Sequence, residues 1–215
     1  MKTSLSILSA LCLPLQVWGQ GTFAFNNDGV NGSPIAPVYS PEASNPHEQK
    51  WGNAANANPS GPQTYTGEPL GGVAYSVEAW YSLTPVLDVY ALTPNASAAD
   101  RSLINFFPVG GFFERVDVFV ADVAGAPGIY LQVRAWDNAG GQYSSWAGAW
   151  GAAQAGSGKA VGWSKVFWQP VAYGTFPPPG LYNFESFNIF IVLEPGTLVL
   201  TGLGGLCLLL LRRHK

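Results

Sequence analysis

An apolar run near the C-terminus, residues 197–211, sets the first limit on the fold. The run contains no charged side chain, and as an α-helix it would rise about 22 Å, against a hydrocarbon core of about 30 Å in a bilayer. A helix in the core of a soluble domain needs only one apolar face, whereas this run is apolar all round. We therefore predict a C-terminal transmembrane helix. A buried helix or strand of a soluble domain is the alternative.

Short polar motifs flank this run on both sides. Glu194 and Pro195 precede it, and Arg212, Arg213 and Lys215 follow it. The basic residues are expected to stop translocation and to stay on the cytoplasmic side of the inner membrane. A Glu-Pro pair, a glycine-studded apolar run and terminal arginines, in this order, resemble the PEP-CTERM sorting signal of Gram-negative bacteria.

This resemblance implies a cellular location for the protein and a processing protease for residues 192–215. It implies that the segment is a temporary anchor, recognised by a membrane-embedded cysteine protease called exosortase. We expect cleavage near Glu194-Pro195, because the residue before a proline disfavours the helical conformation and an extended segment is open to a protease. The domain before it would then be released from the inner membrane to the cell surface or extracellular matrix.

The N-terminus has the pattern of a secretory signal peptide. A positive start precedes an apolar segment, residues 5–15, that is too short to span a bilayer comfortably. Val17 and Gly19 then stand at the minus-three and minus-one positions of a cleavage site. We predict that residues 1–19 are removed on export. A lipoprotein signal that uses Cys12 is the alternative.

The two cysteines, Cys12 and Cys207, both lie in these terminal segments. The exported domain, residues 20–191, can therefore form no disulfide and no zinc–thiolate site, although its compartment is oxidising. It carries six Lys and Arg against twelve Asp and Glu, a formal net charge of −6. Nucleic-acid binding needs clustered Lys and Arg, so we expect no nucleic-acid partner. We also predict no cofactor and no metal site.

Alternation of apolar and polar side chains predicts strands along the exported domain. The strongest run is residues 129–137, where Ile129, Leu131 and Val133 share one face and Trp136 lies on the outward face. Abundant Gly, Pro and Asn between such runs, and the lack of long helical periodicity, predict an all-β fold. Other strands are predicted at residues 22–26, 38–39, 72–82, 86–92, 111–120, 161–168 and 184–193.

Many short strands with frequent turns favour an antiparallel β-sandwich of two sheets, jelly-roll or immunoglobulin-like. Residues 40–65 are rich in proline and should form a long surface excursion, because proline is excluded from central strands. Residues 143–158 should be a short irregular helix or loop outside the core. The predicted core includes Val73, Val77, Val118, Leu131 and Val133.

A second, looser resemblance covers most of the exported domain. Residues 133–137 (Val-Arg-Ala-Trp-Asp), 140–143 (Gly-Gly-Gln-Tyr) and 162–167 (Gly-Trp-Ser-Lys-Val-Phe) are similar to the ectodomains of verrucomicrobial PEP-CTERM proteins. This resemblance supports the fold and the address, and it implies no particular activity.

Residue chemistry argues against an enzyme. His47 is the only histidine of the exported domain, so a catalytic triad or a metal cluster would depend on one loop residue. Paired carboxylates stay open, because a glycosidase needs just two carboxyls flanking a sugar. The candidates are Glu78, Asp88, Glu114, Asp117, Asp122 and Asp137.

The tryptophans favour a binding role. Their rings offer a large apolar face with one polar group, and tryptophan is a frequent anchor at interfaces. Trp136, Trp146 and Trp150 are the candidate ligand-facing residues, although packing in the core is the ordinary role of any single tryptophan. We predict an exported, non-catalytic cell-surface or extracellular-matrix protein that contacts polysaccharide. The alternative is a secreted carbohydrate-active enzyme with paired carboxylates.

Overall fold

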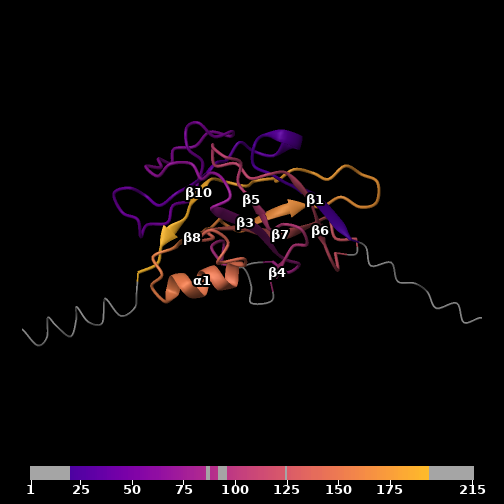
Figure 1. Ribbon diagram of the computed structural model, residues 1–215. Helices are drawn as coiled ribbons and strands as arrows, with labels where there is room; N and C mark the ends of the chain where they lie inside the picture. The colour runs from indigo at the N-terminus through magenta and orange to yellow at the C-terminus, as the bar shows by residue number, and fades with distance from the viewer. Residues whose placement is uncertain (1–19, 86–87, 92–95, 124, 194–215) are drawn as a thin grey trace, which may run out of the picture.

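The computed structural model describes residues 20–85, 88–91, 96–123 and 125–193. This part of the chain is mostly β-structure with one α-helix (Figure 1). The strands are β1 (Gly21–Phe25), β2 (Val38–Tyr39), β3 (Tyr75–Ser82), β4 (Ser97–Ala98), β5 (Ile104–Asn105), β6 (Val116–Val120), β7 (Gly128–Asp137), β8 (Ala160–Trp163), β9 (Phe167–Pro170), β10 (Phe187–Asn188) and β11 (Phe190–Ile191). The helix α1 spans Trp146–Gln154, and a 3₁₀ turn spans Val30–Gly32.

The largest sheet is built around β3 and β7. These strands pair antiparallel along the whole of β3, from Tyr75 opposite Asp137 to Ser82 opposite Tyr130. The other edge of β7 pairs with β8 and β9, and β8 pairs with β11. β4 and β5 pair with β3. Two smaller sheets join β1 to β6 in antiparallel and β2 to β10 in parallel orientation.

One apolar cluster connects the large sheet to the β1–β6 pair. Leu131 and Val133 from β7 and Val77 from β3 are completely buried, together with Phe23 and Phe25 from β1. Alternate positions of each strand supply these side chains, as the sequence pattern predicts. The prediction of a strand at residues 129–137 and of a core containing these valines and Leu131 is confirmed, and Val118 is also fully buried.

Val73 is the one predicted core residue that the structure places at the surface, with 76% of it exposed. It lies in the turn before β3, after Gly72, whose φ of 77° is in the left-handed region. Asn138 Nδ2 donates a hydrogen bond to the Val73 carbonyl at 2.7 Å and so holds the turn. The prediction was wrong because alternation shows that a strand is present but not where it begins.

Four other predicted strands are shorter than expected or broken, and one of them, at residues 184–193, is reduced to β10 and β11. Residues 88–91 form a turn, in which the Asp88 side chain accepts a hydrogen bond from the Tyr90 backbone, so the predicted strand at 86–92 is wrong there. The expected strand at 111–120 exists only as β6. The expected strand at 161–168 divides into β8 and β9, because Ser164 Oγ accepts from the Val133 backbone and donates to the Lys165 carbonyl.

Helix α1 covers the opposite face of the large sheet from the β1–β6 pair (Figure 1). Ser145 caps its first turn by accepting a hydrogen bond from Gly148 N. Its buried side chains, Trp146, Ala149 and Ala153, pack with Trp136 and other residues of the sheet. The helix therefore belongs to a second apolar cluster, and the expectation that residues 143–158 stay outside the core is wrong. The small alanines allow the helix to approach the sheet closely.

The segments between β2 and β3 contain no strand among residues 40–65, which agrees with the predicted excursion. No helix within the described ranges is long and apolar enough to cross a membrane. The predicted signal peptide, residues 1–19, and the predicted membrane helix, residues 197–211, lie outside the residues that the structure describes.

Candidate functional site

The candidate site lies on the face of the large sheet that α1 covers in part. Antiparallel pairing places polar and aromatic side chains opposite one another on this face: Ser76 opposite Trp136, Glu78 opposite Arg134, and Trp80 opposite Gln132. Such cross-strand neighbours interact directly. The pairing register therefore brings together residues that lie more than fifty positions apart in the sequence.

A pocket of about 360 Å³ opens beside α1 on this face. We call it the aromatic pocket. Its volume is at the lower end of the roughly 300–1,000 Å³ that is typical of ligand sites. The residues that line it are Tyr90, Ala91, Gln132, Arg134, Trp146, Trp150 and Trp163.

Three tryptophan rings form the main wall of the aromatic pocket. Trp146 and Trp150 are one helical turn apart on α1, so they share a face of the helix, and their rings stack at 5.9 Å between centroids with an angle of 9°. The Trp163 ring, from β8, stands edge-on to both, at 6.2 and 5.6 Å. Trp146 is almost buried, whereas Trp150 and Trp163 are partly exposed. These two rings can therefore offer apolar surface to a ligand.

Arg134 supplies the positive charge of this site. Its guanidinium lies 4.2 Å from the centre of the Trp80 ring and 5.3 Å from that of Trp146. Its Nε donates a hydrogen bond to Gln132 Oε1 at 3.1 Å. Burial lowers the pKa of Arg134 to about 10, although the nearby charge of Glu78 acts in the opposite direction. The side chain is still protonated at neutral pH.

Gln132, two residues before Arg134 on β7, fixes the orientation of the Arg134 side chain. Only 2% of Gln132 is exposed, and its Nε2 donates to the backbone carbonyls of Tyr90 and Ser164, each at 3.2 Å. Because both amide hydrogens have acceptors, the amide oxygen is directed to Arg134. The amide thus joins three separate segments of the chain at the floor of the pocket.

The excursion before β3 supports the pocket from the side. Trp51 Nε1 and Gln49 Nε2 both donate to the Trp163 carbonyl, at 2.7 and 2.9 Å. The Trp51 ring also packs against the Tyr90 ring, with 4.7 Å between centroids. Two residues of the pocket therefore depend on contacts with a segment that contains no strand.

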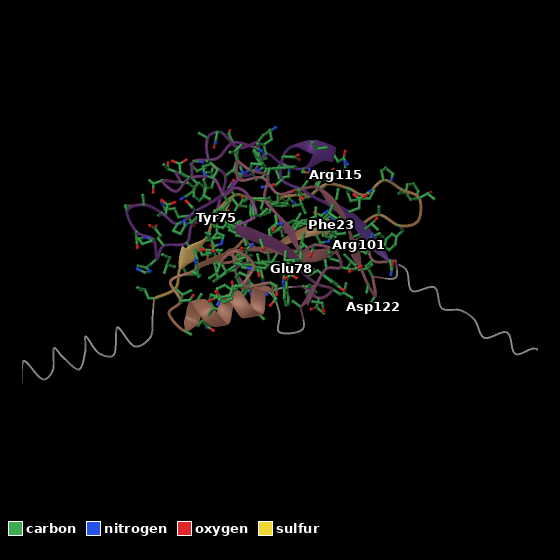
Figure 2. All side chains as sticks on the ribbon, in the orientation of Figure 1. Phe23, Tyr75, Glu78, Arg101, Arg115 and Asp122 are labelled. Atoms are coloured by element: carbon green, nitrogen blue, oxygen red, sulfur yellow. The ribbon has the colours of Figure 1, made fainter. Side chains whose placement is uncertain are left out.

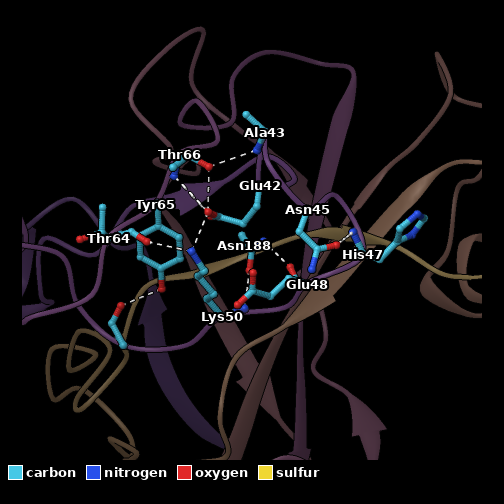
Figure 3. Close-up of polar contacts among 11 residues, drawn as sticks. Glu42, Ala43, Asn45, His47, Glu48, Lys50, Thr64, Tyr65, Thr66 and Asn188 are labelled. Carbon is cyan, nitrogen blue, oxygen red and sulfur yellow. Dashed lines mark hydrogen bonds and ion pairs between the residues drawn. The ribbon is translucent and has the colours of Figure 1, made fainter.

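A buried ion pair holds this excursion together (Figure 3). Glu42, of which 1% is exposed, accepts hydrogen bonds from Lys50 Nζ at 2.7 Å and from Thr66 Oγ1 at 2.8 Å. Burial raises the pKa of the Glu42 carboxyl, but the hydrogen bonds and charge of Lys50 and the hydrogen bonds of Thr66 together bring it below the ordinary value. The Glu42 carboxylate is therefore ionised and links Lys50 and Thr66 through hydrogen bonds.

The carboxyls proposed as a catalytic pair are dispersed. Glu78 is partly buried and accepts a hydrogen bond from Trp80 Nε1 at 2.6 Å, and burial raises its pKa. Asp137 pairs with Lys159 at 3.1 Å. The other four, Asp88, Glu114, Asp117 and Asp122, are exposed. Figure 2 shows Glu78 between the sheet and α1, and Asp122 at the edge of the fold.

No carboxyl of the described chain lines the aromatic pocket. In the same ranges, no three His, Cys, Asp or Glu side chains come close enough together to hold a metal ion. The pocket therefore presents aromatic faces, one guanidinium and one amide, which is a set of groups for binding.

The structure brings two of the three candidate tryptophans, Trp146 and Trp150, to the aromatic pocket. Trp136 has no exposed surface; it packs edge-on beneath Trp146 at 6.1 Å and donates its Nε1 hydrogen bond to the Tyr143 carbonyl. Trp136 lies on the predicted face of β7, opposite the apolar face. Because α1 covers its ring, Trp136 supports Trp146 and does not itself reach the pocket.

Five residues of the pocket were not among the candidate site residues from the sequence: Tyr90, Ala91, Gln132, Arg134 and Trp163. Arg134 and Gln132 alternate on the polar face of β7, which was a visible signal, but nothing in the sequence showed what covers that face. The predicted sorting and basic-stop residues, Glu194, Pro195, Arg212, Arg213 and Lys215, lie outside the described residues.

Comparison with known proteins adds no relative to this picture. The chain matches no protein-family model, no curated protein and no solved structure. Its function has to be argued from the geometry of the aromatic pocket.

Proposed function

We propose that the chain is an exported, non-catalytic β-sandwich protein of the cell surface or extracellular matrix that holds polysaccharide in its aromatic pocket. The observation that carries this proposal is the composition of the pocket wall, in which partly exposed Trp150 and Trp163 stand beside Arg134 and Gln132. Sugar rings have an apolar face and a rim of hydroxyls. Ring stacking with a few directed polar groups is the ordinary way to bind such a ligand.

The proposed address comes from the two ends of the sequence. A signal peptide at residues 1–19 exports the domain, and the PEP-CTERM-like segment at residues 192–215 retains it in the inner membrane until an exosortase-type protease acts. The basic residues Arg212, Arg213 and Lys215 keep the C-terminus in the cytoplasm. A polysaccharide-binding pocket suits a protein that is then released into a matrix of such polymers.

A secreted carbohydrate-active enzyme is the second candidate function. Glu78 favours it, because burial raises the pKa of this carboxyl, as in a general acid. A glycosidase also needs a second carboxyl on the other side of the sugar. The described residues that line the aromatic pocket include no carboxyl. We therefore prefer the binding function.

Binding is tested with the full chain in detergent and a panel of neutral and acidic polysaccharides. Trp150→Ala removes one of the two partly exposed tryptophan rings of the pocket and should weaken binding about tenfold, which corresponds to roughly 1.4 kcal/mol. Trp168→Ala is the matched control, because Trp168 is 42% exposed on β9 and does not line the pocket. Equal losses in both variants would contradict the proposed site. Release of reducing ends by the wild-type chain would favour the enzyme.

The address is tested separately, by mass spectrometry of the protein from its native host. Wild-type protein should end near Glu194-Pro195, and the variant with alanine at both positions should be exported but retained at full length in the inner membrane. A dominant C-terminal peptide that still ends at Lys215 would show that the segment is a permanent anchor.

A further inference from the structure

We infer that the sugar bound by the aromatic pocket carries a carboxylate, so that the ligand is a uronate unit of an acidic polysaccharide and Arg134 is the residue that recognises it. This inference rests on the proposed function and narrows its ligand class. It follows from the charge, the free hydrogen-bond donors and the fixed geometry of the pocket.

Arg134 is the only charged side chain among the described residues that line the aromatic pocket. It makes one hydrogen bond within the described chain, from Nε to Gln132 Oε1. Its two terminal nitrogens have no acceptor there. A guanidinium with free terminal nitrogens binds a planar, two-oxygen anion best, because two parallel N–H···O bonds form at once. A carboxylate is such an anion, and a sugar hydroxyl is not.

The guanidinium is held in place before a ligand arrives. The Trp80 ring lies against it at 4.2 Å, and the Gln132 amide, anchored on two backbone carbonyls, holds its Nε edge. An arginine restrained in this way loses little conformational freedom on binding. Partial burial also strengthens its hydrogen bonds relative to those of an exposed arginine.

Trp163 contributes ring surface to the same wall. Its ring nitrogen is buried and has no hydrogen-bond partner within the described chain. Because this nitrogen has no accessible surface, Trp163 meets a ligand only through the exposed part of its ring. A sugar ring stacked at Trp150 lies beside this wall, while its carboxylate extends to Arg134.

Glu78 allows a test in which a substitution should strengthen binding of the acidic sugar rather than weaken it. It lies across from Arg134 on β3, and its charge interacts with that of Arg134, but it does not line the pocket. Its negative charge opposes the binding of an anion. Glu78→Gln removes that charge and keeps an amide oxygen that can accept from Trp80 Nε1. The variant should therefore bind the acidic sugar more tightly than the wild type.

The experiment uses the full chain in detergent at fixed low ionic strength. The probes are short oligogalacturonates and the same oligomers as methyl esters, which keep the ring and lose the charge. Binding is followed by tryptophan fluorescence. Wild type should bind the acid at least tenfold more tightly than the ester. Arg134→Gln should abolish this difference, Arg134→Lys should restore only part of it, and Glu78→Gln should increase it. Unfolding temperatures of each variant check that the fold is intact.

Other outcomes separate this inference from the proposed function. Equal binding of acid and ester, lost in Trp150→Ala, overturns the carboxylate assignment and leaves the polysaccharide pocket standing. Tighter binding of dextran sulfate than of oligogalacturonate also overturns it. If acid and ester both fail to bind, the inference fails, and a neutral glucan bound through Trp150 would keep the proposed function. Failure of all these probes overturns both.

Discussion

The two faces of the β3–β7 pair are built from alternate residues of the same two strands, yet they differ in polarity and charge. One face is apolar and closed: Val77, Ala79, Leu131, Val133 and Ala135 have no exposed surface. The other face carries charge, amides and indoles, and part of it opens into the aromatic pocket: Glu78, Trp80, Gln132 and Arg134. The comparison indicates that the first face packs the core, whereas the second presents polar and aromatic groups at a pocket.

The polar face is stable because its groups compensate one another. Gln132 has a partner for its oxygen and for both amide hydrogens, as buried polar groups require. Glu78 and Arg134 stand directly opposite each other on the two strands with opposite charges, which offsets part of the cost of burying the Glu78 carboxylate. The apolar face needs no such arrangement, and its stability comes from area removed from water.

The largest effect is expected on the closed face. Leu131→Ala should lower the free energy of unfolding by about 2–5 kcal/mol, because it removes apolar volume from a fully buried site and leaves a cavity. Chemical denaturation of the full chain measures this loss. The control is Arg134→Gln, three residues along the same strand, which should affect ligand binding more than stability. Similar losses of stability in the two variants would remove the distinction between the faces.

The next effect is on the excursion that supports the open face. Glu42→Gln breaks the buried pair with Lys50 and should cost about 3 kcal/mol, at the low end for such pairs, because 21% of the Lys50 side chain is exposed. The contact between Trp51 and Tyr90 should loosen with it, so ligand affinity should fall as well. Denaturation and tryptophan fluorescence at pH 7 measure the two losses.

The effect of Glu42 should also depend on pH. The folded-state pKa of Glu42 is below its ordinary value of 4.5, so its contribution to stability is present above that value. The contribution is lost as the pH falls through the folded pKa. The gap between wild type and Glu42→Gln should therefore narrow in acid. A difference in unfolding free energy that stays constant from pH 7 to pH 3 would show that ionised Glu42 does not stabilise the fold.

Glu78→Gln should have a smaller effect of opposite sign. Burial raises the folded-state pKa of Glu78 above its ordinary value, so the folded protein binds this proton more tightly than the unfolded chain does. Stability from this group therefore falls as the pH rises through that interval. At pH 7 the variant should be slightly more stable than the wild type, with the gain disappearing at low pH. A less stable variant at pH 7 would show that the pairing with Arg134 outweighs burial.

The two faces also differ in how far the sequence predicts them. Alternation located β7 and most of the closed face, because burial on one side of a strand leaves a period of two. The aromatic pocket could be predicted only in part, through Trp146 and Trp150, because Tyr90, Gln132, Trp150 and Trp163 come from four separate segments. They meet only through the antiparallel register and the position of α1. Trp136 shows the same limit. The face of β7 on which it lies could be predicted, but its burial under α1 could not.

The smallest expected effect is that of Val73→Thr, which tests the boundary of β3 against Val77→Thr. Val73 and Val77 are the same residue type, four positions apart and on the same side of the predicted strand, yet 76% of Val73 is exposed and none of Val77. Threonine has nearly the shape of valine but brings a hydroxyl, which costs about 1–3 kcal/mol when buried without a partner. Val77→Thr should lose that amount. Val73→Thr should change the free energy of unfolding by less than about 0.5 kcal/mol, as surface substitutions do. Denaturation of both variants decides where the closed face ends, and equal losses would mean that β3 begins before Tyr75 and that the apolar face extends to Val73.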